Sequence, residues 1–461
     1  MTRAAVVLAA GQGRRMKSDL PKVLHPVAGR PMVRHVIEAA RGAGVDRIVV
    51  VVGHGAEQVR TALTGVEGVI FAEQTQQLGT GHAVLAAADH IRDTTTVLVL
   101  PGDVPLIEPE TLTRLFDRQQ QSQCAAVVLT AMVDDPTGYG RIVRGSDGGL
   151  RRIVEEADAG PAERALREIN TGLMVFATPA LLGALTRIGR NNRQGEYYLV
   201  DVVPLLLAEG SRVETVLADD GLETMGVNDR VELARAGAVM RQRLLRRWML
   251  EGVTIVDPAT TFIDVEVRIG RDTIIEPFTV LAGRTVIGRR CHVGPGAQVY
   301  DSQIGDDSRV HASVVESSRL GNGVTVGPFN HLRPGTTLGD RVKIGNFVEL
   351  KNTQVGVGSK VPHHSYVGDA TLGRDVNIGA GVVTVNYDGR AKHRTEIGDG
   401  AFVGCNVNLI APVCIGRGAY VAAGSTVDTD VPDDALAIAR ARQTNKEGWA
   451  RRRREQEPDR S

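Results

Sequence analysis

The sequence predicts two folds in one chain: an α/β, doubly wound domain of the Rossmann type and, after it, a left-handed parallel β-helix built from hexapeptide repeats. Up to about residue 220, short β-branched runs alternate with helical stretches. From about residue 255 to 430, an aliphatic residue followed by glycine recurs every six positions. A chain of 461 residues is also too long for one ordinary hydrophobic core, so more than one core is expected.

The N-terminal half is predicted to form parallel strands that helices cover on both faces. Residues 5–8, 47–52 and 97–100 are continuous apolar runs, each ending in a Gly- or Pro-rich turn. Such runs, followed by helices, are typical of strands buried on both sides of a sheet. Ligands of these sheets bind beyond the carboxyl ends of the strands, so we expect the functional residues of this half there.

A stretch with helical spacing lies between the two patterns. Its apolar residues recur at that spacing among many arginines: Met240, Leu244, Leu245 and Trp248. This spacing predicts a connecting helix. The expected limits are therefore residues 1–227 for the α/β domain, 228–252 for the linker helix and 253–461 for the β-helix domain with its C-terminal tail.

The six-residue repeat of an aliphatic residue followed by glycine extends over most of the C-terminal half. Its clearest pairs begin at these residues: Ile287 and Val293, Leu320 and Val326, Leu338 and Ile344, Leu372 and Ile378, Ile397 and Val403, and Ile415 and Val421. In the left-handed form three hexads close one coil, the aliphatic residue points inward, and glycine suits the tight corner. An ordinary Gly-rich sandwich would not hold a six-residue phase. We expect about ten coils and a cap on the last one from residues 432–454.

Composition excludes several classes of protein. Hydrophobic residues make up 42% and charged residues 23%, as in soluble globular proteins. Basic and acidic residues both total 54, which argues against nucleic-acid binding. No stretch approaches the roughly 20 apolar residues of a membrane helix, and no secretory signal is present, so a cytoplasmic protein is expected. The cysteines lack zinc-ligand spacing and are expected to be reduced thiols: Cys124, Cys291, Cys405 and Cys414.

A glycine-rich turn directly follows the first strand. Residues 8–16 read LAAGQGRRM, and Pro21-Lys22 follows a short distance on. Small residues let backbone N–H groups approach phosphate oxygens, while Arg15 and Lys22 can neutralise a triphosphate. Met16 replaces the third glycine of a nicotinamide-binding fingerprint, and no P-loop GK[ST] follows. Taken alone, the turn could also be an ordinary tight βα loop.

Further segments favour a nucleotide-binding role for this turn over an ordinary βα loop. Residues 8–22 are similar to the signature of sugar-1-phosphate nucleotidyltransferases. Six more segments resemble the uridylyltransferase domain of the bifunctional N-acetylglucosamine-1-phosphate uridylyltransferase / glucosamine-1-phosphate N-acetyltransferase family: residues 77–82, 102–106, 135–141, 168–172, 195–198 and 226–229. The resemblance covers nearly the whole chain.

The resemblance implies uridylyl transfer from UTP to N-acetylglucosamine 1-phosphate, with release of pyrophosphate. It implies Mg²⁺ held by Asp103 and Asn228, although Asp103 alone could equally be a helix-capping carboxylate. It implies that the nucleotide and sugar bind at Leu8, Ala9, Ala10, Gly11, Arg15, Lys22, Gln74, Gly79, Thr80, Gly102, Asp103, Gly140, Glu155, Asn170 and Asn228. Arg14 departs from the Thr or Ser of the family pattern.

Ionisable residues interrupt the hexads at residues 360–369, which read KVPHHSYVGD. Neighbouring positions on a strand face opposite ways, so His363 and His364 cannot both address one site. An isolated histidine in a repeat is commonly a surface residue. By resemblance to the family's G-H-x-x-Y pattern, with Pro362 in place of the glycine, His363 is the catalytic base of acetyl transfer.

Other segments of this half match the same family: residues 332–335, 346–351, 377–381 and 386–389. The resemblance implies substrate binding at Arg333, Lys351, Tyr366 and Asn377. It implies acetyl-CoA binding at Ala380, Asn386, Tyr387, Cys405, Ala423 and Arg440. Cys405 departs from the family's Ser, and a thiol is a weaker hydrogen-bond donor. The resemblance also implies a homotrimer with acetyl sites between neighbours, and the basic run at 451–454 is expected to be a solvated tail.

The implied function is synthesis of UDP-N-acetylglucosamine, a precursor of peptidoglycan and lipopolysaccharide. Acetyl-CoA first acetylates glucosamine 1-phosphate, and UTP then uridylylates the product. Two alternatives are weighed against this: a nucleotidyltransferase whose β-helix serves only assembly, and a regulatory subunit whose two sites are degenerate. His363 with Arg333 and Lys351 disfavours the first, and Lys22 with Asp103 disfavours the second.

Overall fold

The computed structural model describes residues 2–456 and divides into two compact units, one ending at Leu244 and the other beginning at Leu245. The division falls within helix α9 (Arg230–Leu250). No helix among residues 2–456 is long and apolar enough to cross a membrane. All four cysteines are free thiols, as expected.

The first unit is built on one nine-stranded sheet. Its main strand order is β11-β7-β10-β6-β1-β4-β5, and β8 and β9 continue from β10. The strands are β1 (Arg3–Ala9), β4 (Arg47–Val52), β5 (Val69–Glu73), β6 (Thr96–Pro101), β7 (Ala126–Met132), β8 (Gly140–Arg144), β9 (Leu150–Val154), β10 (Glu168–Ala177) and β11 (Val213–Leu217). The runs expected to form parallel strands do so, since β1 is parallel to β4 and β6, whereas β10 runs antiparallel to β6 and β7 and makes the sheet mixed.

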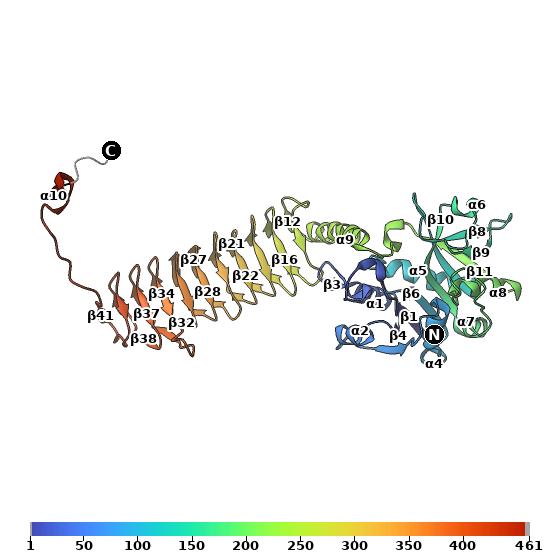
Figure 1. Cartoon of the computed structure of the whole chain (residues 1–461), viewed down its shortest axis with the longest axis horizontal. Helices are drawn as coiled ribbons and strands as arrows, with labels where there is room; N and C mark the ends of the chain where they lie inside the picture. Colours follow the sequence, from blue (N-terminus) through green and yellow to red (C-terminus); the bar gives the residue numbers. More distant parts are fainter. Residues whose placement is uncertain (1, 457–461) are drawn as a thin grey trace. The chain divides into compact units, whose positions relative to one another are not determined.

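Helices cover both faces of this sheet (Figure 1), which confirms the doubly wound α/β fold. Ala5 and Val7 of β1 pack with one helical layer, whereas Ala4 and Val6 pack with the other, as the two-residue period of a strand requires. The helices on the first face are α1 (Met32–Gly42), α2 (Ala56–Ala62) and α5 (Pro109–Ser122); those on the second are α3 (Thr80–Ala86), α4 (Ala88–Ile91), α7 (Thr178–Leu185) and α8 (Val202–Ala208). The remaining short elements are α6 (Pro161–Arg164), β2 (Pro26–Val27), β3 (Arg30–Pro31) and the 3₁₀ turns η1 (Arg14–Met16), η2 (Lys22–Leu24), η3 (Leu199–Asp201) and η4 (Gly221–Thr224).

The second unit is the left-handed β-helix, with stacked coils of short parallel strands forming three sheets (Figure 1). The first sheet has β12 (Thr254–Ile255), β15 (Ile274–Ile275), β18 (His292–Val293), β21 (Arg309–Val310), β24 (Thr325–Val326), β27 (Lys343–Asn346), β30 (Lys360–His363), β33 (Asn377–Ile378), β36 (Phe402–Val403), β39 (Tyr420–Val421) and β41 (Leu436–Ala437). The second has β13 (Phe262–Ile263), β16 (Val280–Ala282), β19 (Gln298–Tyr300), β22 (Val314–Glu316), β25 (His331–Leu332), β28 (Glu349–Lys351), β31 (Tyr366–Gly368), β34 (Val383–Val385), β37 (Asn408–Ile410) and β40 (Thr426–Val427). The third has β14 (Arg268–Ile269), β17 (Val286–Ile287), β20 (Gln303–Ile304), β23 (Arg319–Leu320), β26 (Thr337–Leu338), β29 (Gln354–Val355), β32 (Ala370–Leu372), β35 (Thr395–Ile397) and β38 (Val413–Ile415).

The aliphatic residues of the hexads stack into the core of this prism. In the first sheet the buried column is Ile275, Val293, Val310, Val326, Ile344, Val361, Ile378, Val403 and Val421. One coil departs from the regular step. Lys343 pairs with Lys360, 17 residues on, and Lys360 pairs with Asn377, again 17 on, but Asn377 pairs with Phe402, which is 25 on. The extra residues form a loop between β34 and β35.

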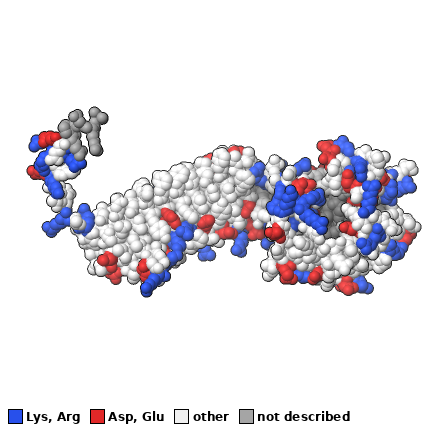
Figure 2. All heavy atoms as spheres, viewed as in Figure 1, with Lys and Arg blue, Asp and Glu red and all other residues white. Residues whose placement is uncertain are grey.

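Charged side chains lie along one edge of the β-helix face in view in Figure 2, and most of that face is uncharged. At the C-terminal end, β41 pairs with β39, and Val431 and Ala437 pack on the core. Residues 440–456 are exposed, and they include helix α10 (Trp449–Gln456). The expected cap over residues 432–454 is therefore wrong beyond Arg440: the Ala439 backbone and the Arg440 side chain still contact the last coils, and the residues after them are mostly polar and exposed.

Candidate functional site

A cavity of about 560 Å³ opens at the carboxyl ends of β1 and β6. Nine residues predicted to bind nucleotide or sugar line it: Leu8, Ala9, Ala10, Gly11, Lys22, Gln74, Gly79, Thr80 and Asp103. The sheet brings them together because β1 and β6 are parallel neighbours whose carboxyl ends meet at one edge. The predicted glycine turn, the QLGTGH segment and the GDVPL segment thus form one pocket.

The backbone of the pocket depends on glycine at two positions. Gly79 has a φ of 110°, and a Cβ there would lie 2.6 Å from the Tyr197 carbonyl oxygen. Gly102 donates its N–H to the Leu8 carbonyl at 2.9 Å, and a Cβ on it would lie 3.0 Å from the same oxygen. Both glycines let two chain segments approach more closely than a side chain allows.

Polar side chains then fix the loop over the pocket. Gln74 is buried, and its amide donates to the Gly79 carbonyl at 3.0 Å. The Thr80 hydroxyl accepts the N–H of Leu199 at 2.9 Å. These bonds hold the segment before α3 against the edge of the sheet.

Two side-chain oxygens, from Asp103 and Asn228, face the ammonium group of Lys22 at this pocket. The Lys22 ammonium forms an ion pair with the Asp103 carboxylate and donates to the Asn228 side-chain oxygen at 3.2 Å. The Val227 N–H donates to the Asp103 carbonyl at 2.9 Å, which fixes the two segments side by side. A carboxylate and an amide oxygen facing one positive charge are ligands of the kind that a hard divalent ion prefers. No cluster of three His, Cys, Asp or Glu ligands occurs within residues 2–456, so any such ion must also take oxygens from substrate or water.

The three predicted sugar-binding residues form a second cluster. Asn170 on β10 pairs with Gly140 on β8, and a Cβ on Gly140 would lie 3.4 Å from both Asn170 and the Glu155 carboxylate. A Cβ on Gly172 would lie 3.1 Å from Pro101, which lines the cavity, so the cluster adjoins the pocket. Burial, together with the Asp158 and Asp201 carboxylates, raises the pKa of Glu155 above its ordinary value.

Six of the fifteen predicted residues are not part of the cavity lining: Arg15, Gly102, Gly140, Glu155, Asn170 and Asn228. Arg15 lies on η1, is exposed, and is not part of the cavity lining. Residues that line the cavity but were not predicted as binding residues include Gln12, Arg14, Gln77 and Glu196. The sequence carried a signal for each of these, because all four stand inside the segments that match the family pattern.

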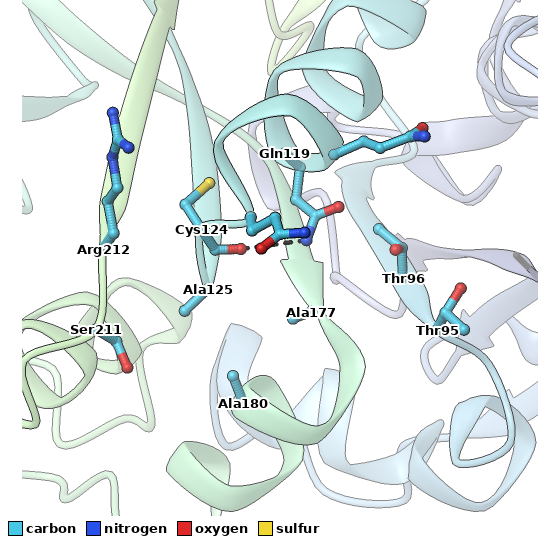
Figure 3. Close-up of a pocket in the computed structure, with 11 residues that line it drawn as sticks. Thr95, Thr96, Gln119, Cys124, Ala125, Ala177, Ala180, Ser211 and Arg212 are labelled. Carbon is cyan, nitrogen blue, oxygen red and sulfur yellow. Dashed lines mark hydrogen bonds between the residues drawn. The ribbon is translucent and has the colours of Figure 1, made fainter.

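A second cavity of this unit, of about 610 Å³, lies at the opposite end of the sheet (Figure 3). Thr95 and Thr96 at the start of β6 line it, with Gln119 at the end of α5 and Arg212 before β11. None of its lining residues is among the predicted site residues. The amino ends of the strands therefore take no part in the predicted chemistry.

In the β-helix, several predicted residues follow one corner of successive coils. His363 pairs with Asn346 of the preceding coil, and its carbonyl accepts the N–H of Gly381, the neighbour of Ala380. The Ala380 carbonyl accepts the N–H of Asn406 at 2.7 Å, and the Cys405 carbonyl accepts the N–H of Gly424 at 2.8 Å. His363, Ala380, Cys405 and Ala423 thus lie in one ladder, and the side chain of Arg440 reaches its end beside Gly424.

The second sheet carries the other predicted residues on its outer face. Tyr366 pairs with Glu349, whose carboxylate accepts from Arg333 at 3.0 Å, and Lys351 ends the same strand as Glu349. The Asn386 amide comes from the extra loop and reaches the Tyr366 hydroxyl at 3.4 Å.

Two predicted residues stand apart from this group. Asn377 lies on the first sheet, where it pairs with Lys360, and Tyr387 is 57% exposed on the extra loop. The predicted substrate and acetyl-CoA residues therefore adjoin one another, because Asn386 of the second set bonds Tyr366 of the first.

The two adjacent histidines differ in their surroundings. His363 is exposed, and its imidazole makes no hydrogen bond within the described part of the chain. His364 turns the corner with a φ of 46° and packs its ring against Phe347, with centroids 6.3 Å apart. Both imidazoles are exposed, and of the two only that of His364 packs on a neighbouring aromatic ring among the described residues.

Comparisons with known proteins agree with this division of sites. Residues 5–196 match the MobA-like NTP transferase domain, and residues 266–301, 317–352 and 394–429 match the bacterial transferase hexapeptide repeats. The chain is 52% identical over 451 residues to the bifunctional protein GlmU of Geobacillus sp. WCH70, with 98% of each chain covered. It is 53% identical over 454 residues to the GlmU protein of Exiguobacterium sp. AT1b, with 98% of this chain and 100% of that one covered.

The chain belongs to the GlmU family. The family resemblance expected from the sequence is confirmed. As a GlmU protein, the chain is a bifunctional transferase, with a nucleotidyltransferase of the MobA-like kind and an acyltransferase of the hexapeptide kind. This disfavours a β-helix that serves only assembly and a subunit without activity.

Proposed function

We propose that this GlmU chain synthesises UDP-N-acetylglucosamine in two steps. Glucosamine 1-phosphate first receives an acetyl group from acetyl-CoA, and the product then receives a uridylyl group from UTP with release of pyrophosphate. The observation that carries the proposal is the convergence of Lys22, Asp103 and Asn228 at the nucleotide pocket, on a chain whose β-helix also presents His363 beside Ala380.

The uridylyl step requires positioning and charge neutralisation more than a protein base. The small residues 8–11 offer backbone N–H groups to phosphate oxygens, and Lys22 supplies a positive charge. Asp103 and Asn228 are the residues that would hold Mg²⁺, because both face the position of a cation. When bound there, Mg²⁺ neutralises charge on the phosphate oxygens. The sugar 1-phosphate lies at Gly140, Glu155 and Asn170 and attacks the α-phosphorus in line.

The acetyl step requires a base for the amine and a site for the sugar phosphate. His363 removes a proton from the glucosamine nitrogen as that nitrogen attacks the thioester carbonyl. Arg333 and Lys351 bind the phosphate, with Tyr366 and Asn377 against the sugar. The ladder of Ala380, Cys405 and Ala423, with Asn386, Tyr387 and Arg440, receives acetyl-CoA.

The finer assignments belong to the same proposal. Residues 1–227 carry uridylyl transfer, 228–252 form the linker and 253–461 carry acetyl transfer. The protein acts in the cytoplasm as a homotrimer, in which neighbouring β-helices complete each acetyl site.

The direct test is reconstitution with the purified chain. Incubation with Mg²⁺, UTP, acetyl-CoA and glucosamine 1-phosphate is expected to yield UDP-N-acetylglucosamine, identified by mass spectrometry. Formation of a UDP-sugar without the acetyl group would contradict the proposed order of steps.

The raised pKa of Glu155 predicts that the rate of uridylyl transfer declines on the acid side of its pH profile, a decline called the acid limb below. An ionised carboxylate accepts hydrogen bonds from sugar hydroxyls more strongly than the protonated acid, so kcat/KM for N-acetylglucosamine 1-phosphate should fall as the pH drops through this raised pKa. Removing a neighbouring negative charge with Asp201→Asn should lower the pKa of Glu155 and move the limb to lower pH. Asp219→Asn, which changes an exposed carboxylate paired with Arg114, is the control. An acid limb that stays in place in Asp201→Asn would contradict the assignment.

A further inference from the structure

A buried carboxylate links the residues of the acetyl site. Asp369 follows β31, is 9% exposed and has a left-handed φ of 49°. One carboxylate oxygen accepts the Asn352 amide at 2.7 Å, and the other accepts the Asn386 amide at 2.6 Å. Its own N–H donates to the Lys351 carbonyl at 2.9 Å. Asp369 was not among the predicted site residues, although it closes the KVPHHSYVGD segment.

We propose that Asp369 is a positioning residue of the acetyl site: its carboxylate holds the Asn386 amide beside the Tyr366 hydroxyl and so fixes the loop that follows β34 to the coil that carries Lys351. This inference rests on the proposed function and names a residue through which that site is organised. No contact between Asp369 and a substrate is needed for it.

The packing around Asn386 leaves that amide little freedom. Asn386 is 8% exposed, and its nitrogen is shared between Asp369 and the Tyr366 hydroxyl. A Cβ on Gly368 would lie 2.9 Å from this nitrogen and would also collide with the Tyr366 hydroxyl. The loop that carries Asn386 is the one that breaks the regular coil step. The carboxylate of Asp369 therefore bonds this loop to the regular coils.

The electrostatics of the cluster agree with this role. Lys351, through a hydrogen bond and charge repulsion, lowers the pKa of Lys392, and the charges of Asp369 and Tyr366 oppose that effect. Burial acts to raise the pKa of Asp369, but the bonds from Asn352 and Asn386, with the two lysines, outweigh it and lower that pKa. Asp369 therefore stays ionised between two cations that repel each other.

Other charged groups near Lys392 are already engaged. On its own loop, His393 bonds the Asp388 carboxylate at 2.7 Å. Arg394 donates to the Thr371 hydroxyl and the Ala370 carbonyl. Among these groups, Asp369 supplies the negative charge that acts on Lys392.

The test is Asp369→Asn in the full chain. The neutral amide keeps one acceptor oxygen for Asn386, can meet Asn352 only if that amide reverses, and removes the charge that strengthens both bonds. We expect kcat/KM for acetyl transfer to fall about 10- to 100-fold, the range for loss of a charge-assisted buried bond. Without the negative charge of Asp369 the pKa of Lys392 is lowered further, so the alkaline limb of acetyl transfer should move to lower pH.

Two further variants make the test specific. Asp369→Asn combined with Asn352→Asp exchanges acid and amide between two corner positions of similar backbone, with φ of 49° and 48°. This exchange allows both side-chain bonds to re-form. The double variant should therefore transfer acetyl groups about tenfold or more faster than Asp369→Asn alone. Asp301→Asn is the matched control, because Asp301 occupies the equivalent corner after β19 with a φ of 45°, and within residues 2–456 its carboxylate accepts a hydrogen bond from the Arg284 N–H alone. Its acetyl transfer should stay within about twofold of wild type.

Uridylyl transfer by the same chains reports whether they are folded, and it should not change in Asp369→Asn. Acetyl transfer within twofold of wild type in Asp369→Asn would overturn the positioning role. So would a loss that leaves the alkaline limb in place and lowers the melting temperature, since that is the behaviour of a structural residue. A wild-type chain without acetyl transfer would refute the proposed function and this inference together, whereas an active wild type with an unaffected variant refutes the inference alone.

Discussion

Replacing His363 with alanine is expected to reduce acetyl transfer by about 10²- to 10⁴-fold, the usual contribution of a general base, while uridylyl transfer stays at the wild-type rate. His363 is exposed and its ring has no protein partner within residues 2–456, so its removal should not disturb the coil. Its carbonyl bonds to Ser365 and Gly381 come from the backbone and survive the substitution. The measurement is release of free CoA thiol that depends on glucosamine 1-phosphate.

The neighbouring histidine provides the control. His364→Ala removes an exposed imidazole of the same corner that packs on Phe347, and it should leave acetyl transfer within about threefold of wild type. Equal losses in the two variants would contradict the assignment of the base. Loss of both activities in His363→Ala would show that the substitution unfolds the chain instead of removing a catalytic group.

Replacing Asp103 with alanine is expected to reduce uridylyl transfer by about 10²-fold or more and to leave acetyl transfer unchanged. The variant removes the carboxylate that faces Lys22 and leaves Asn228 as the one remaining protein ligand of the proposed metal site. The concentration of Mg²⁺ needed for half-maximal rate should therefore rise. The rate is read as pyrophosphate release from UTP with N-acetylglucosamine 1-phosphate.

The control for this variant is Asp219→Ala, which removes an exposed carboxylate paired with Arg114 and absent from the cavity lining. It should not change either activity by more than about twofold. An Asp103→Ala protein with an unchanged magnesium requirement would contradict the proposed role of this residue.

Much of the fold follows from local periodicity, and the exceptions have physical causes. The hexads predicted the buried column because each aliphatic residue is set by its own coil and not by distant partners. The antiparallel direction of β10 could not be predicted, because a strand buried on both faces has the same apolar pattern in either direction. The cap was wrong because the polar tail has little apolar surface to place on the last coil.

In the functional sites, too, residues close together in the sequence could be predicted, whereas contacts between distant segments could not. Segments such as residues 8–16 and 77–82 were identified because their residues are contiguous. The approach of Asn228 to Lys22 joins residues 206 positions apart, and only the fold reveals that they share a bond. Asp369 was missed because its partner Asn386 stands on the loop that breaks the hexad phase, where periodicity carries no information. Arg15 was assigned from its charge and its place in the matching segment, and the turn of η1 leaves it exposed and outside the cavity lining.

The most direct measurement is ³¹P NMR of the complete reaction, repeated with one substrate withheld at a time. With all substrates present, the glucosamine 1-phosphate signal should give way to N-acetylglucosamine 1-phosphate and then to UDP-N-acetylglucosamine and pyrophosphate. Without acetyl-CoA, UTP should persist and little pyrophosphate should form. Pyrophosphate released at an undiminished rate in the absence of acetyl-CoA would contradict the two-step synthesis on which the account depends.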